Sequence, residues 1–162
     1  MLNTLQAQVL PVSKAQSDST ADTTWYFQPT IETEYRPLDS PYTLSIKNFS
    51  QYMQSTRIVF ELQNNTSEQL NHCWMHVALR DRQGMFLYAE QPLFFSNTAP
   101  NGKTLIDMYF ESVGKDEIGF IVLYPGLLEI NRKEIPFETK NIRIVVPENL
   151  QDVQTGFYSE FQ

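Results

Sequence analysis

The alternation of hydrophobic and polar positions is most regular in residues 57–89, where it predicts three consecutive β-strands. Its three stretches, residues 57–63, 73–80 and 85–89, each place apolar side chains at every second position, as the strands of a half-buried sheet do. The two stretches between them carry Asn, Asp and Gly, which favour chain reversal. The pattern therefore predicts strands joined by short turns.

The rest of the chain supplies further strand signals but no amphipathic helix of ten residues or more. The other predicted strands are residues 42–47, 93–95, 104–111, 119–124, 127–130 and 142–146, with an additional edge-strand candidate at 30–35. Loops are expected at residues 48–55 and 96–102, and a turn at Pro125 and Gly126. Residues 119–124 are apolar without alternation, which is typical of a strand buried on both faces.

These elements predict an all-β fold: a single antiparallel two-sheet β-sandwich, immunoglobulin-like or jelly-roll, of about eight strands. Three segments are expected along the chain. Residues 1–23 are polar and without period, and predict a flexible N-terminal arm. Residues 24–147 form the sandwich domain, beginning at the aromatic triplet that starts with Trp25. Residues 148–162 are interpreted as a C-terminal tail.

Composition limits the function classes without choosing among them. A chain of 162 residues can bury the core of one domain without metal or disulfide, and a lone cysteine, Cys73, excludes an intrachain bridge. The net charge of −7 and the lack of any basic run argue against nucleic-acid binding. No apolar run approaches the ~20 residues of a membrane span, and the N-terminus has no basic signal-peptide region. The compartment stays open.

The densest group of reactive side chains is the run from His72 through Cys73 and Trp74 to His76. Histidine and cysteine are metal ligands, but on an extended strand the two histidines share a face about 13 Å apart, and Cys73 points to the other face. Only a strand that begins after Cys73 would let His72 and Cys73 approach a common ion. We therefore expect no metal site and no Cys–His catalytic pair, with Cys73 in the core.

No other stretch carries a catalytic or cofactor motif. Glu90, Asp107 and Glu111 fall near strand ends, where paired carboxylates could act as in a glycosidase, but acidic side chains on a solvated sheet face are far commoner. The sequence thus predicts a non-enzymatic protein without cofactors.

Aromatic residues out of phase with the core are the binding candidates. Trp74, His76, Tyr88 and Tyr109 are expected to point outward, and on one sheet face they would form a platform with polar handles such as Asp107. Such platforms stack sugars or bury a partner's anchor residues. The alternative is that the chain covers this face itself, with the arm around Trp25 and Phe27 or with Phe157 and Phe161.

Residues 60–66 and 77–84, within a pattern that covers about 42–111, resemble small bacterial immunoglobulin-like sandwiches. These are the domains called FxLYD and the intracellular proteinase inhibitors of the BsuPI type. The resemblance implies a non-catalytic module of an envelope or secreted protein, and no binding residue is carried over from it. The expected function is protein interaction or self-assembly, as a structural or accessory subunit. The alternatives are carbohydrate binding by the aromatic residues, and inhibition of an enzyme by a loop such as 96–102.

Overall fold

The computed structural model describes residues 39–158. The predicted arm at 1–23, the predicted start of the domain at 24 and the edge-strand candidate at 30–35 lie outside the described residues. The described chain contains nine strands: β1 (Tyr42–Tyr52), β2 (Ser55–Asn64), β3 (Leu70–Arg80), β4 (Phe86–Thr98), β5 (Lys103–Glu111), β6 (Phe120–Ile130), β7 (Lys133–Ile135), β8 (Ile142–Val145) and β9 (Gln154–Phe157). Three single-turn 3₁₀ helices connect them: η2 (Lys115–Glu117), η3 (Thr139–Asn141) and η4 (Glu148–Leu150).

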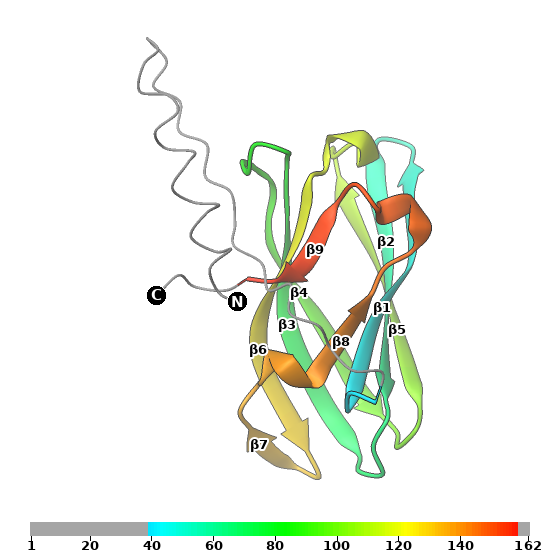
Figure 1. Cartoon of the computed structure of the whole chain (residues 1–162), viewed down its shortest axis with the longest axis vertical. Coiled ribbons are helices and arrows are strands. Elements are labelled where there is room, and N and C mark those ends of the chain that lie inside the picture. Colours follow the sequence, from blue (N-terminus) through cyan, green and yellow to red (C-terminus); the bar gives the residue numbers. More distant parts are fainter. Residues whose placement is uncertain (1–38, 159–162) are drawn as a thin grey trace.

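The strands form two sheets that lie face to face, which confirms the predicted β-sandwich (Figure 1). The first sheet has the order β5-β2-β1-β8. The second has the order β4-β3-β6, and both β7 and β9 pair along the other side of β6. The sheets are not wholly antiparallel as expected, because β8 runs parallel to β1 and β9 runs parallel to β6. Hairpins impose antiparallel pairing, whereas β8 and β9 each arrive by a connection from the opposite sheet.

The core lies between the sheets and follows the alternation of the sequence. On β2 and β3 the inward positions are fully buried: Ile58, Phe60, Leu62, Cys73, Met75, Val77 and Leu79. The prediction that residues 119–124 are buried on both faces is also met over Phe120–Leu123, since all four residues of that stretch are buried. Burial of a large apolar side chain contributes about 1.5–3 kcal/mol, so these layers supply most of the driving force for folding.

Four local predictions are corrected by strand pairing. The expected loop at 48–55 is mostly strand, because β1 passes a register shift after Ile46 and continues to Tyr52. Pro125 and Gly126 do not reverse the chain, and β6 continues across them. The stretches 85–89 and 93–95 join into one long strand, β4. An edge strand tolerates Pro92 because proline removes a donor that has no ladder partner there.

The fourth correction concerns residues 148–162, for which the sequence predicts a C-terminal tail. Of these, Glu148–Leu150 forms η4 and Gln154–Phe157 forms β9, which pairs with β6 in the second sheet. Phe157 is 1% exposed and packs in the core, with its ring centroid 5.8 Å from that of Phe137. This segment thus belongs to the sandwich as far as the described residues extend.

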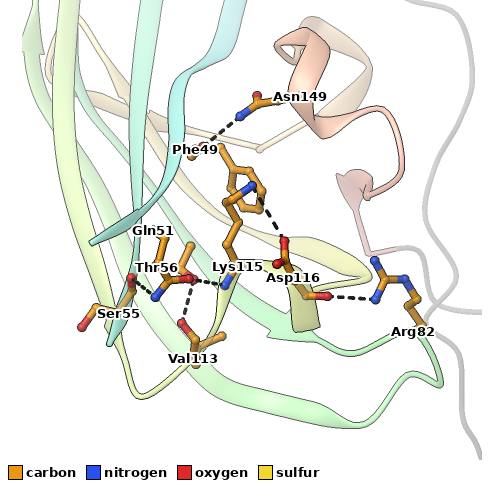
Figure 2. A network of polar contacts seen from close by, with 9 residues as sticks. All are labelled: Phe49, Gln51, Ser55, Thr56, Arg82, Val113, Lys115, Asp116 and Asn149. Carbon is orange, nitrogen blue, oxygen red and sulfur yellow. Dashed lines mark hydrogen bonds and ion pairs between the residues drawn. The ribbon is translucent and has the colours of Figure 1, made fainter. Parts of the chain in front are cut away.

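Polar contacts tie the two sheets together at the end where β5 leads into β6 (Figure 2). The side-chain oxygen of Gln51, on β1, accepts a hydrogen bond from the backbone N–H of Lys115 at 2.7 Å. From the second sheet, Arg82 in the β3–β4 turn donates to the backbone carbonyl of Asp116 at 2.9 Å. The β5–β6 connection is therefore anchored to both layers.

Candidate interaction surface

The outer face of the second sheet carries a group of exposed rings, which we call the aromatic face. It consists of His72, Trp74 and His76 from β3 and Phe94 from β4. These side chains point outward because their neighbours Cys73, Met75 and Phe95 are in the core, and side chains alternate along a strand. The register places Trp74 opposite Phe94 on β4 and opposite Leu127 on β6.

The rings of the aromatic face touch one another mostly at tilted angles. Trp74 and Phe94 meet edge to face, with centroids 6.1 Å apart and planes at 83°. Trp74 lies 5.9 Å from His76 at 40°, and His72 stacks on Phe94 at 5.2 Å and 27°. Trp74 and Phe94 remain 40% and 41% exposed. Mutual contact restricts the orientations that each ring can adopt, so these side chains would lose less entropy in any further contact.

The histidines supply the polar rim of this surface. His72 Nε2 lies 3.2 Å from Oε1 of Glu129, which is its Cα partner on β6. This contact, together with the stacking on Phe94, fixes the orientation of the His72 ring. His76 is half-buried beside Trp74 and opposite Pro92. The face therefore combines an apolar centre with polar groups at its edge, the usual anatomy of an interface.

The half of the outer face that lies over β6 and β9 is covered by the protein itself. Phe120 and Val122 are buried there, and Tyr124 and Tyr158 pack against them with their own ring centroids 5.1 Å apart. Of the C-terminal residues considered as a cover, Phe157 faces the core, and Phe161 lies outside the described residues. Among the described residues, the exposed rings on the outer face of the second sheet therefore lie on β3 and β4.

A bulge in β6 positions the Trp74 backbone. The β3–β6 register shifts between Trp74 and Met75, whose partners are Leu127 and Pro125, so Gly126 is the extra residue. A Cβ on Gly126 would clash with the Trp74 carbonyl oxygen and would lie 3.0 Å from the carbonyl carbon. Only glycine leaves room for this approach, which is a common use of glycine in a strand.

The structure brings together two of the four predicted binding residues and separates the others. Trp74 and His76 share the aromatic face. Tyr109 lies on β5 in the first sheet, with its ring 5.5 Å from Tyr52. Tyr88 is half-buried against the core and meets Phe110 edge to face at 5.2 Å. The four therefore do not form one platform.

Register explains why Tyr88 turns inward. Pairing between β3 and β4 shifts on both sides of Leu79, whose partner is Tyr88, and each shift changes which face of β4 is outward. Sequence reasoning also missed Phe94, because the strand signal at 93–95 was separated from 85–89 by the proline at 92. Leu93, Phe94 and Phe95 are three apolar residues in a row, and on a strand with one outward face the middle one must point outward, which is the signal that could have found Phe94.

The acidic residues considered for catalysis are not assembled. Glu90 lies on β4 in the second sheet, whereas Asp107 and Glu111 lie four residues apart on β5 in the first. Asp107 accepts hydrogen bonds from Arg57 Nε and Nη2 at 3.0 and 2.8 Å, and these hydrogen bonds raise the pKa of the guanidinium. Asp107 is therefore neither beside Trp74 nor opposite Glu90.

Cys73 is a core residue, separated from His72 by the sheet itself. It is 1% exposed, and burial raises the pKa of its thiol to about 12. The thiolate is the nucleophile and metal ligand of cysteine chemistry, so a thiol held protonated here is inert. Within residues 39–158 no group of three His, Cys, Asp or Glu side chains could hold a metal ion.

We expect Cys73 to resist iodoacetamide at pH 8 in the folded protein and to react in urea. Folding keeps the thiol protonated above pH 9, its ordinary pKa, so the folded state binds more protons than the unfolded state between pH 9 and 12. The thiol contribution to stability is therefore full below pH 9 and falls as pH rises, by up to about 1.4 kcal/mol per pH unit. Mass spectrometry of the alkylated protein checks the resistance of Cys73 to iodoacetamide.

Urea unfolding at pH 8 and pH 10.5 checks whether the contribution of the Cys73 thiol to stability falls as the pH rises. The stability advantage of the natural protein over Cys73→Ala should shrink at the higher pH. Equal differences at both values, or rapid alkylation of the folded protein, would contradict a buried neutral thiol.

Comparisons with known proteins add a fold likeness. The sequence matches no protein-family model and no curated protein. The structure is similar to that of IrmA from Escherichia coli, with a TM-score of 0.51 and 13% sequence identity, over 75% of this chain and 95% of that one. At this identity the likeness shows the fold alone. No helix among the described residues is long and apolar enough to cross a membrane.

Proposed function

We propose that this protein is a non-enzymatic interaction module and that the aromatic face is where it binds a protein partner. The observation that supports this most is the exposure of Trp74 and Phe94 side by side on the outer face of the second sheet. Tryptophan is enriched among residues that dominate binding energy, especially when packed neighbours exclude water around it. A role as a structural or accessory subunit follows from such a surface.

The strand arrangement supports an immunoglobulin-like version of the sandwich. Strands β1, β2 and β5 share one sheet while β3, β4 and β6 share the other, as strands A, B, E and C, C′, F do in immunoglobulin-type domains. We include in this proposal that the protein resembles the bacterial FxLYD and BsuPI-type modules, which use such sandwiches without catalysis. No binding partner of those modules is assigned to this protein.

Carbohydrate binding is the weaker reading. It was expected to place Asp107 beside Trp74, and Asp107 is instead on the other sheet, bound to Arg57. A sugar-binding site also offers flat ring faces, whereas Trp74 and Phe94 meet at 83°. The loop expected to inhibit an enzyme is shorter than 96–102, because β4 extends to Thr98.

The experiment is site-specific photo-cross-linking in cells that produce the protein naturally. Benzoylphenylalanine replaces Phe94 in one variant and Tyr109, which is similarly exposed at 44% but lies on the other sheet, in a second. We expect a discrete adduct with a different protein from position 94 and none from 109. Adding Trp74→Ala should weaken that adduct at least about 30-fold, since hot-spot truncations cost about 2 kcal/mol or more.

Trp74→Ala should keep the fold, because an exposed side chain contributes little to core packing. Circular dichroism and the urea midpoint check this. Equal adducts from both positions would contradict docking at the aromatic face. Retention of the protein on cellulose or chitin, lost on Trp74→Ala and without a protein adduct, would favour the carbohydrate reading.

A further inference from the structure

Strand β5 is a regular edge strand of the first sheet (Figure 1). All nine of its residues pair with β2 on one side, without a register shift. No strand among the described residues pairs with its other side, so every second backbone N–H and carbonyl of β5 points to an open edge. We propose that two copies of this protein join here, β5 against β5, as an antiparallel pair with Asp107 at the two-fold axis.

The other sheet edges within residues 39–158 are short or interrupted. Strands β7, β8 and β9 have three, four and four residues. Strand β4 is longer, but it contains Pro92, which has no N–H to donate, and its register with β3 shifts twice. Strand β5 has neither a proline nor a register shift. Because short, bulged and proline-bearing edges resist the addition of a strand, β5 is the edge best suited to pair.

The charges at the two ends of β5 are self-complementary. Lys103 begins the strand and Glu111 ends it, and both are exposed. Neither has an ion-pair partner among the described residues. A two-fold axis that passes through Asp107 normal to the sheet places Lys103 of each copy opposite Glu111 of the other, on the same face. Opposite charges in such cross-strand positions attract, and the symmetry forms two of these pairs.

Between the charged ends, the same register pairs apolar side chains. Leu105 and Tyr109 are 57% and 44% exposed, and each would face the other across the two copies. On the inner face, Ile106 would come opposite Met108. Ile106 packs against the core but is only half-buried, as a side chain at an open sheet edge is. Each copy would therefore cover apolar surface that the other leaves accessible.

At the axis two carboxylates would meet, and each already has a counter-charge. Asp107 would lie opposite Asp107 of the second copy, which is unfavourable for bare carboxylates. Arg57 on β2 donates hydrogen bonds to Asp107 from Nε at 3.0 Å and from Nη2 at 2.8 Å. The group across the axis would thus hold two positive and two negative charges, which sum to zero.

Neighbouring registers lose the match. Rotation about an axis normal to the sheet keeps every side chain on its own face, so the axis can move only by whole residues along β5. Moved one residue toward the start of the strand, it would place Lys103 opposite Tyr109. Moved one residue toward the end, it would place Glu111 opposite Leu105. Both registers set a charge against an apolar side chain, whereas the axis at Asp107 satisfies both.

Charge reversal in the full-length protein tests the pairing. Sedimentation velocity over about 1–200 μM should show a monomer–dimer equilibrium, with a dissociation constant in the micromolar range because the interface is small. Lys103→Glu or Glu111→Lys alone should weaken the dimer at least about tenfold, since each creates two like-charge pairs. Both changes together should restore the dissociation constant to within about threefold. The two positions are about 26 Å apart on one strand, so this rescue can act only between copies.

Lys133→Glu is the matched control. Lys133 is an exposed residue of β7 in the second sheet, and its replacement changes the net charge by the same amount. The dissociation constant should not change, and circular dichroism checks that every variant is folded. A monomer at every concentration would overturn the proposal. A dimer that Lys103→Glu weakens no more than the control does would also overturn it, because the copies would then meet elsewhere.

A mixed disulfide tests the register without changing any charge. Leu105→Cys mixed with Tyr109→Cys should give a disulfide-linked dimer on a non-reducing gel, because the two Cα atoms would lie about 5 Å apart. Leu105→Cys alone should not, because its two copies would lie about 13 Å apart along the strands. The natural cysteine, Cys73, is buried and does not compete. Equal yields from the mixture and from Leu105→Cys alone would contradict the axis at Asp107.

This pairing is separable from the proposed function. Strand β5 belongs to the first sheet, whereas the aromatic face lies on the second. In the cross-linking experiment, an adduct from position 109 that contains only this protein would belong to the β5 pair. A monomeric protein that still gives the partner adduct at position 94 would overturn the pairing alone. A charge-dependent dimer without that adduct would support the pairing and remove the proposed function.

Discussion

Replacing Gly126 with alanine should destabilise the protein by about 3 kcal/mol and alter the environment of Trp74. The new methyl group would overlap the Trp74 carbonyl, so either the β6 bulge or the β3 backbone must move. Backbone on both sides of the contact gives no flexible side chain that could yield. Urea unfolding measures the loss, and fluorescence of the Trp25→Phe background reports the shift at Trp74.

Gly114→Ala is the matched control. A Cβ there would meet only Glu117 side-chain atoms, the nearest at 3.6 Å, and Gly114 already has a φ of −82°, which alanine adopts. The change should stay within about 0.5 kcal/mol of the natural protein. A Gly126→Ala protein as stable as this control, with unchanged Trp74 fluorescence, would mean that the bulge does not position Trp74.

Replacing Asn64 with alanine should also cost about 3 kcal/mol. This side chain is fully buried and donates to the backbone carbonyls of Glu68, Thr98 and Ala99 at 2.8, 3.2 and 3.2 Å. Its oxygen accepts hydrogen bonds from the backbone N–H and the hydroxyl of Thr66. Alanine would leave several of these groups unpaired, each at about 1–3 kcal/mol if no water reaches it.

The neighbouring Asn65→Ala provides a comparison of the same chemistry with less burial. Asn65 is half-buried, and its side chain donates to the Ser40 carbonyl and to Thr43 Oγ1. Its loss should cost about 1 kcal/mol. Urea midpoints of the two variants give the ratio of the stability losses caused by Asn64→Ala and Asn65→Ala. Equal losses at both positions would show that Asn64 does not join the β2–β3 and β4–β5 connections.

Local alternation was enough to assign side chains to faces wherever a strand is regular. It placed Cys73 in the core and Trp74 outside, so these two neighbours lie on opposite faces of β3. The same reasoning failed for Tyr88, because register shifts on β4 change the phase of alternation. Such shifts depend on the partner strand, which the local pattern does not contain.

The sequence by itself determined that this protein is a β-sandwich, and which face of its regular strands is apolar, because a period of two is a local property of the chain. Only the tertiary structure decided that Trp74 and Phe94 share a surface, that Tyr109 is on the opposite sheet, and that β9 belongs to the domain. Those outcomes depend on pairing between strands far apart in sequence. The physical reason is that alternation fixes a side chain's face within its strand, whereas the neighbours on that face are chosen by the packing of the whole core.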